Sequence, residues 1–215
     1  MLKEGEVDIA LICSLAFVLG ERDGYLEGLV VPKVNGDILY RSYIIVHNDS
    51  DIDTFEELRG KSFAFTDPDS YSGRLAVLDL LNDKGETAES FFDRTYYTYS
   101  HDYSVKSVAS KLVDGAAVDS LVFDQMLELQ LENVQNLKII EYGEWVGTPP
   151  IVVSSYLSDE LKYKTKDILL NMHNDKEGIE ILKQLNVEEF VPINPDNYQP
   201  IKDMIEAVGE ERWKN

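Results

Sequence analysis

The feature of this chain that most constrains its fold is an alternation of short apolar runs with amphipathic segments in its middle part. The apolar runs, which we read as strands, cover residues 61–65, 96–99, 116–123 and 137–141. The amphipathic segments, which we read as helices, cover residues 73–82, 102–112 and 124–131. Strands and helices that alternate across short loops predict a parallel sheet with right-handed crossovers. We therefore expect an α/β protein whose sheets are rich in parallel strands and flanked by helices.

The segments on either side of this middle part predict a second group of elements. A short buried strand is expected at residues 6–12. Two β-branched and aromatic runs, 28–34 and 38–47, flank the turn signal Asn35-Gly36-Asp37, which predicts a hairpin-like ribbon. After Gly147-Thr148-Pro149-Pro150 the pattern restarts with a strand and then helices.

This order of elements predicts two lobes that are linked by two crossing segments. We expect lobe 1 to comprise residues 1–46 and 150–215 and lobe 2 to comprise residues 47–149, with crossings near 44–47 and 149–153. Ligands of open α/β sheets bind beyond the carboxyl ends of the strands. Three predicted strand ends carry polar groups, so we expect a ligand-binding cleft between the lobes.

The stretch Thr66-Asp67-Pro68-Asp69-Ser70-Tyr71-Ser72-Gly73 lies between a predicted strand and the helix that follows it. The first N–H groups of a helix have no intrahelical acceptor, and at such a junction they can bind an anion. Ser70 and Ser72 add hydroxyl donors, and Gly73 would let a ligand approach the backbone closely. The stretch therefore indicates an anion site, while the same residue types also form ordinary helix N-caps.

The composition excludes several classes of function. Forty acidic and twenty basic residues give a net charge of -20, which repels nucleic acid and anionic membranes. The single cysteine, Cys13, rules out an internal disulfide and a cysteine-based zinc site. The histidines His47, His101 and His173 are isolated in the sequence, so we expect no metal and no cofactor. No stretch reaches the roughly 20 apolar residues of a membrane span.

Several short sequences together resemble one family, the phosphate, phosphite and phosphonate-binding proteins of ABC importers. In chain order they are Gly5-Glu6-Val7-Asp8-Ile9-Ala10, Tyr40-Arg41-Ser42, Asp49-Ser50, Leu58-Arg59-Gly60-Lys61, Asp67-Pro68-Asp69-Ser70-Tyr71-Ser72-Gly73, Ser100-His101-Asp102, Val113-Asp114-Gly115-Ala116-Ala117-Val118-Asp119-Ser120 and Pro150-Ile151-Val152-Val153. The resemblance covers nearly the whole chain in the family's order. It implies the two-lobed type II periplasmic-binding fold and a non-catalytic module that closes on its solute.

The resemblance also implies which residues hold the ligand. In the family a Ser-Thr-Ser-Gly turn binds the phosphonate oxygens, which implies that Ser70, Tyr71 and Ser72 form an oxyanion clamp. The family histidine maps to His101, whose ring N–H would donate to the oxyanion across the cleft, and the tyrosine ahead of the crossing strand maps to Tyr40.

A further position and three departures from the family pattern affect the expected ligand and assembly. The resemblance also implies that Asp119 corresponds to an acidic residue that some members use to bind an amino group. Tyr71 stands where the family has Thr, so either the pocket is narrower or the phenol points elsewhere. Pro149 stands where aminophosphonate-binding members carry an Asp, which weakens the case for an amino-bearing phosphonate and makes phosphite, phosphate, methylphosphonate or an unrelated oxyanion equally expected. The family's first strand, its helix and a pocket tyrosine would precede Met1, and the exposed sheet edge predicts a homodimer, local disorder or impaired ligand binding.

We therefore expect a solute-binding protein that captures a small phosphorus oxyanion and has an ABC transporter permease as its partner. Its expected location is periplasmic or extracellular, with membrane association in the native full-length protein through a signal or anchor absent from this chain. The alternative is a ligand-sensing domain of a membrane receptor or histidine kinase with the same fold. A serine hydrolase, with Ser70 or Ser72 beside His101, is less expected because no Gly-x-Ser-x-Gly elbow is present.

Overall fold

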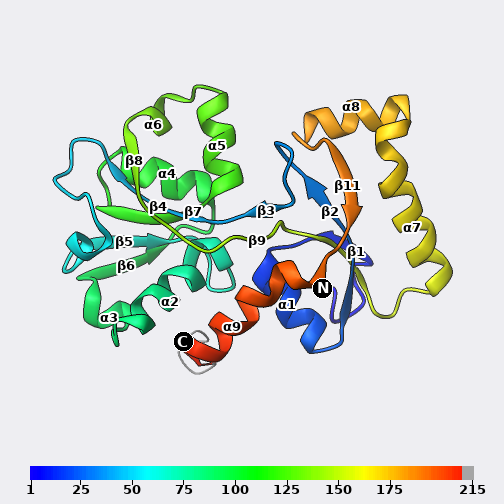
Figure 1. Ribbon diagram of the computed structural model, residues 1–215, viewed down its shortest axis with the longest axis horizontal. Helices are drawn as coiled ribbons and strands as arrows, with labels where there is room; N and C mark the ends of the chain where they lie inside the picture. Colours follow the sequence, from blue (N-terminus) through cyan, green and yellow to red (C-terminus); the bar gives the residue numbers. More distant parts are fainter. Residues whose placement is uncertain (210–215) are drawn as a thin grey trace. The chain divides into compact units, whose positions relative to one another are not determined.

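The computed structural model describes residues 1–209, which form two compact units. Unit 1 comprises Met1–Tyr40 and Val146–Ile201, and unit 2 comprises Arg41–Trp145 and the chain from Lys202 onward. Figure 1 shows the elements of both units in the colours of the sequence. Within the described residues, no helix combines the length and the apolar character that crossing a bilayer requires.

Unit 1 is built on a four-stranded sheet in the order β1-β10-β2-β11, in which every neighbouring pair is antiparallel. The strands are β1 (Ile9–Leu11), β2 (Leu26–Lys33), β10 (Ile151–Ser154) and β11 (Glu189–Pro192). The helical elements of this unit are α1 (Ser14–Arg22), α7 (Asp159–Asn171), η3 (Met172–Asn174), α8 (Lys176–Gln184), η4 (Pro195–Tyr198) and the start of α9 (Gln199–Val208). A separate two-stranded ladder joins β3 (Leu39–Tyr40) to β9 (Val146–Gly147).

Unit 2 is built on a five-stranded mixed sheet in the order β6-β5-β7-β4-β8. The strands are β4 (Ser42–His47), β5 (Ser62–Phe65), β6 (Arg94–Tyr97), β7 (Gly115–Asp119) and β8 (Leu137–Tyr142). The helical elements are η1 (Phe55–Leu58), η2 (Tyr71–Leu75), α2 (Ala76–Asp83), α3 (Ala88–Phe91), α4 (His101–Ala109), α5 (Ser120–Glu128) and α6 (Glu132–Gln135). Strand β5 is parallel to β6 and β7, whereas β4 is antiparallel to β7 and β8.

The alternation of side chains along β4 explains the three layers of unit 2. Ile44 and Val46 pack with α2 and α3 on one face, while Tyr43 and Ile45 pack with α4, α5 and α6 on the other (Figure 1). Because successive strand residues point to opposite faces, an unbroken apolar run fits only a strand covered on both sides. The predicted α/β class and the helices flanking this sheet are confirmed. The expectation that the sheets are rich in parallel strands is wrong, because among the described residues only the pairs β5–β6 and β5–β7 are parallel.

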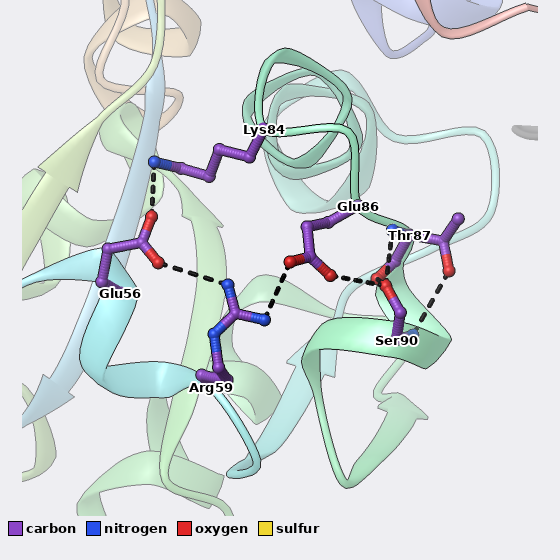
Figure 2. Close-up of polar contacts among 6 residues, drawn as sticks. All are labelled: Glu56, Arg59, Lys84, Glu86, Thr87 and Ser90. Carbon is purple, nitrogen blue, oxygen red and sulfur yellow. Dashed lines mark hydrogen bonds and ion pairs between the residues drawn. The ribbon is translucent and has the colours of Figure 1, made fainter.

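A polar network fixes one end of unit 2 without adding much stability. Arg59 donates to Glu86 at 2.9 Å, and Ser90 donates to the same carboxylate at 2.8 Å. All six members of the network, which are drawn in Figure 2, are Glu56, Arg59, Lys84, Glu86, Thr87 and Ser90. The network ties η1 to the end of α2 and to the Thr87 cap of α3. Its ion pairs are solvent-exposed, so each contributes at most about 1 kcal/mol.

The chain divides between the units a few residues away from the predicted lobe boundaries. Residues 41–46 belong to unit 2 because β4 is inserted between β7 and β8 in its sheet. Residues 146–149 belong to unit 1, where β9 pairs with β3. The end of α9 belongs to unit 2, and its Val208 lines a cavity of about 380 Å³ together with Phe65 and Leu78.

Two sequence-based expectations about the N-terminal part are wrong. The turn Asn35-Gly36 exists, with positive φ at both residues, but only one bridge, Val34 to Asp37, follows from it. The flanking strands β2 and β4 then enter different sheets, because each is buried more completely than a two-stranded ribbon allows. The first strand is also shorter and more exposed than expected, since β1 is an edge strand with β10 as its neighbour.

Candidate functional site

Three polar residues meet at one edge of the unit 2 sheet. Thr66 follows the carboxyl end of β5, and Asp119 is the last residue of β7, which is parallel to β5. Ser42 begins β4 directly opposite Asp119, because β4 runs antiparallel to β7. All three side chains are buried. This edge is the place where the sheet topology brings strand ends and helix starts together.

The helix after β5 begins with a wide turn. The amide of Leu75 donates to the carbonyl of Ser70 at 3.0 Å, which is the five-residue spacing of a π-type turn. The hydroxyl of Ser42 donates to the carbonyl of Ser72 at 2.6 Å and anchors this turn to β4. The amides of Tyr71 and Ser72 belong to this first turn, at the N-terminal end of the helix. They are the donors that an anion could use.

The side chains of the predicted clamp have different tasks in the structure. Ser70 is the N-cap, and its oxygen accepts the Gly73 N–H at 2.9 Å, which leaves the hydroxyl hydrogen able to donate elsewhere. The hydroxyl of Tyr71 donates to the carbonyl of Glu144 at 2.5 Å, and the side chain is fully buried. The phenol therefore points into the fold, which decides between the two possibilities raised by the sequence.

His101 begins α4, and its hydrogen bonds determine its tautomer. Its Nδ1 accepts the Asp119 N–H at 3.1 Å and also lies 3.1 Å from the Thr66 hydroxyl. An amide can only donate, so Nδ1 is the unprotonated nitrogen of the neutral ring and Nε2 carries the hydrogen. The ring is therefore oriented as a hydrogen-bond donor through Nε2.

The protonation state of His101 is set mainly by its burial. Burial lowers the pKa of His101 to about 4, and the negative charges of Asp102 and Asp67 only partly oppose this shift. Three hydroxyl groups in contact with one another continue from the ring. The hydroxyl oxygens of Thr98 and Ser104 are 2.7 Å apart, and that of Ser104 lies 3.4 Å from the Thr66 hydroxyl oxygen. The imidazole is thus neutral at physiological pH and is held by polar groups that need not change their protonation.

Thr66 places the helix start and the imidazole beside each other within unit 2. Its amide donates to the Gly73 carbonyl at 3.1 Å, and its hydroxyl contacts His101. A Cβ added at Gly73 would lie 2.5 Å from the Thr66 Cβ, so glycine is required by packing against Thr66. The expectation that His101 reaches the ligand from the opposite side of a cleft is wrong, because both helices start at the same edge of one sheet.

Asp119 has a structural task that the sequence did not show. Its carboxylate accepts the amides of Leu121 at 2.7 Å and Val122 at 3.3 Å, and so caps α5. Burial raises the pKa of Asp119 to about 7, although these two N–H groups favour the charged form. A carboxyl that is partly protonated near neutrality is a poorer partner for an ammonium group than a surface carboxylate. Its role towards an amino group of the ligand stays a prediction.

The raised pKa of Asp119 predicts a pH-dependent stability. The unfolded state releases the Asp119 proton above its ordinary pKa of 3.8, whereas the folded state keeps this proton up to about pH 7. The free energy of unfolding therefore falls as pH rises from 3.8 to about 7. Asp119→Asn keeps an N-cap acceptor and should raise the unfolding free energy by up to about 4 kcal/mol at neutral pH. Urea unfolding across this pH window tests this, with exposed Asp8→Asn as the control. Destabilisation of Asp119→Asn at every pH would contradict it.

Tyr40 is the one predicted site residue that belongs to the other unit. It is buried, and its backbone pairs with Val146 in the β3–β9 ladder of unit 1. Ser70, Tyr71, Ser72, His101 and Asp119 all belong to unit 2. The contribution of Tyr40 to the site therefore stays a prediction.

Sequence reasoning missed three residues that position the others. Thr66 supports both the Gly73 turn and His101, Ser42 holds the Ser72 carbonyl, and the Ser120 hydroxyl accepts the amide of Arg41 at 3.1 Å. Their positions in the sequence could have indicated them, because each of these hydroxyl residues lies at one end of an apolar strand. Within residues 1–209, no group of three or more His, Cys, Asp or Glu side chains is placed to hold a metal ion.

This arrangement can bind an anion without a formal positive charge. Two backbone amides, two serine hydroxyls and the Nε2–H of His101 are donors, and all stem from residues around one strand edge. Fixed N–H dipoles that are shielded from water bind anions locally, so a net charge of -20 does not prevent binding. A tetrahedral oxyanion has enough acceptor oxygens for such a set.

Comparison with known proteins gives a consistent result. A probable ABC transporter phosphite binding protein, PhnD1 of Prochlorococcus marinus (strain MIT 9301), is 21% identical over 190 residues, which is 83% of this chain. The chain spans 64% of the length of that curated relative.

Two solved structures have the same fold. One is a binding protein component of an ABC phosphonate transporter from Pseudomonas aeruginosa, with a TM-score of 0.87, 24% identity and coverage of 99% of this chain and 76% of the other. The other is PhnD1 of Prochlorococcus marinus in complex with methylphosphonate, with a TM-score of 0.83, 18% identity and coverage of 96% and 80%. The type II periplasmic-binding fold is thereby confirmed.

One family is described as "ABC transporter, phosphonate, periplasmic substrate-binding protein", and its sequence model matches residues 1–198. The match includes the Ser70–Gly73 turn, His101 and Asp119, so it contains the whole edge at which the donors gather. The chain therefore belongs to the family of phosphonate-binding periplasmic substrate-binding proteins of ABC transporters.

Proposed function

We propose that this chain binds a small phosphorus oxyanion, namely a phosphonate, phosphite or phosphate, as the solute-binding component of an ABC importer. The observation that carries the proposal is the junction at Thr66, which packs against Gly73 at the helix start and contacts Nδ1 of His101. Membership of the phosphonate-binding family and the methylphosphonate complex of PhnD1 support the choice of ligand class.

Each donor has a defined part in the proposed capture. The amides of Tyr71 and Ser72 and the hydroxyls of Ser70 and Ser72 bind the oxygens of the anion at the wide turn. His101 donates through Nε2, because its Nδ1 is occupied by the Asp119 amide. Hydrogen bonds to a charged group contribute roughly 1.5–3 kcal/mol each, so four or five of them support micromolar or tighter binding after ordering costs.

Titration calorimetry with the purified chain tests the proposal directly. Methylphosphonate, phosphite and phosphate are the probes, and glycine, which has no phosphorus oxyanion, is the control solute. At least one probe is expected to bind with a dissociation constant of about 1 μM or lower. Absence of binding for all three probes would overturn the proposed function. Unchanged recovery of the bound ligand would support binding without hydrolysis.

The proposed partner is an ABC transporter permease, and the proposed location is periplasmic or extracellular with membrane association of the full-length protein. The permease would accept the oxyanion, whereas a sensor with the same fold would only report it. Expression of the chain with a secretion signal, in a bacterium lacking its own binding protein, distinguishes these roles. Growth on methylphosphonate as the phosphorus source supports transport, and failure of a well-expressed, ligand-binding chain to restore growth favours the sensor.

We further propose that two copies associate through the edge strand β1 of unit 1. In this strand Ile9 is 43% exposed and Leu11 is 65% exposed, and an edge strand presents backbone groups that another strand can pair with. Sedimentation equilibrium should show a dimer for the native chain and a monomer for Ile9→Lys with Leu11→Lys. Leu127→Lys changes an exposed leucine of unit 2 and should leave the dimer intact. A native chain that stays monomeric at all concentrations would refute the contact.

A further inference from the structure

The side chain of Arg41 lies among three aromatic rings of unit 2. Its guanidinium carbon is 4.2 Å from the ring centroid of Tyr142 and 4.3 Å from that of Trp145. The ring of Tyr43 is 5.7 Å away. Tyr142 and Trp145 are 47% and 45% exposed, so these two rings are open to solvent. Cation–π contacts on several sides hold the planar head in a defined orientation.

The backbone of Arg41 connects the two halves of the anion site. Its amide donates to the Ser120 hydroxyl at 3.1 Å, and the Ser120 amide donates to the Arg41 carbonyl at 3.1 Å. The next residue, Ser42, binds the Ser72 carbonyl, and the residue before Ser120 is Asp119, whose amide binds His101. Arg41 therefore starts from the same strand edge as the proposed oxyanion donors.

The guanidinium of Arg41 forms no ion pair within the described residues. No carboxylate of residues 1–209 lies within ion-pair distance of its guanidinium, and its buried Nε has no hydrogen-bond partner there. The neighbouring Asp124 accepts the Tyr43 hydroxyl at 3.2 Å. Burial raises the pKa of Asp124, and the charge of Arg41 partly opposes this shift, so Asp124 is an acidic neighbour of the guanidinium without forming an ion pair with it. The buried Nε–H of Arg41 is the donor that a ligand group could complete.

We infer that Arg41 determines ligand specificity by contacting a second anionic group, so that the preferred ligands are phosphonates that carry a carboxylate on the carbon next to phosphorus. This inference rests on the proposed function. The fixed fork of N–H donors on a guanidinium matches the two oxygens of a carboxylate. The same charge repels the ammonium group of an aminophosphonate. Alkylphosphonates, whose alkyl chain carries no charged group, gain neither effect.

Two probes of similar size isolate this contact. Phosphonoacetate and ethylphosphonate share the phosphorus group and differ in the terminal carboxylate. The native chain should bind phosphonoacetate about tenfold or more tightly than ethylphosphonate by calorimetry, because a charge-assisted hydrogen bond is added. It should bind 2-aminoethylphosphonate more weakly than ethylphosphonate. In Arg41→Gln the ratio between the first two affinities should fall to about one, while Arg94→Gln, which removes an exposed charge from β6, should keep it.

Other outcomes overturn the inference in distinguishable ways. A native ratio near one, or a ratio that Arg41→Gln leaves unchanged, would show that Arg41 does not contact the second group, even if methylphosphonate binds. Failure of every phosphonate to bind would overturn this inference, and failure of phosphite and phosphate as well would overturn the proposed function with it. Arg41→Lys keeps the charge but loses the planar fork, so it should retain only part of the preference. A thermal melt of each variant checks that it folds.

Discussion

Replacing Ser72 and His101 together by alanine is expected to abolish oxyanion binding while the fold persists. Ser72 would lose a hydroxyl donor at the wide turn, and His101 would lose the Nε2–H donor whose orientation the Asp119 amide fixes. At roughly 1.5–3 kcal/mol for each hydrogen bond to a charged group, the dissociation constant should rise by about two to four orders of magnitude. Each single substitution should weaken binding by about tenfold or more.

The measurement is calorimetric titration of methylphosphonate and phosphite into the native and variant chains. Ser158→Ala with His173→Ala makes the same chemical change in unit 1 and should leave affinity unaltered. His101→Ala also leaves the Asp119 amide without its acceptor, so Ser72→Ala with His101→Asn is the matched variant. Asparagine can accept that amide through its Oδ1, whereas its NH₂ group ends short of the position from which Nε2 donates. Retained binding in a folded double variant would refute the assignment of these donors.

The site could be predicted from the sequence as far as local signals reach. The run of small polar residues between a strand and a helix indicates an anion site because its physics is local: a helix start exposes N–H groups. The family resemblance supplied His101. No local pattern predicts the packing of Thr66. Its hydroxyl contacts His101, and its side chain occupies the space that a Cβ at Gly73 would need. The part of the site that the sequence did not predict therefore depends on tertiary contacts.

The fold shows the same division between local and long-range information. The apolar run of β4 predicted a strand but assigned it to a hairpin with the preceding run, because its true partners β7 and β8 are far apart from it in the sequence and leave no local signal. The alternating tyrosines Tyr96, Tyr97, Tyr99 and Tyr103 predict that at least two of these side chains lie in the core. This prediction is wrong, since Tyr96, Tyr99 and Tyr103 are 45%, 70% and 58% exposed. The first lies on β6, which is an edge strand and has one neighbour.

Replacing Gly73 by alanine should damage both stability and binding, and it tests the packing at the centre of the site. The added Cβ would lie 2.5 Å from the Thr66 Cβ, 2.6 Å from the Thr66 hydroxyl and 2.9 Å from the Ser70 hydroxyl. Thr66 is buried and β-branched, so it cannot rotate away, and either the helix start or the end of β5 must move. Overpacking of this kind costs about 1–3 kcal/mol. Because Thr66 contacts His101, the same movement displaces the imidazole from the wide turn.

Urea unfolding and calorimetric titration of Gly73→Ala measure the two effects separately. We expect a loss of about 1–3 kcal/mol in unfolding free energy and at least about a tenfold loss in methylphosphonate affinity, since misplaced donors no longer converge. Gly60→Ala is the control, because Gly60 has φ +70° and no atom near its added Cβ, so it introduces backbone strain without a clash. It should reduce stability by about 1–2 kcal/mol and leave affinity intact. Native affinity in Gly73→Ala would mean that the contact of Thr66 with the helix start does not position the oxyanion donors.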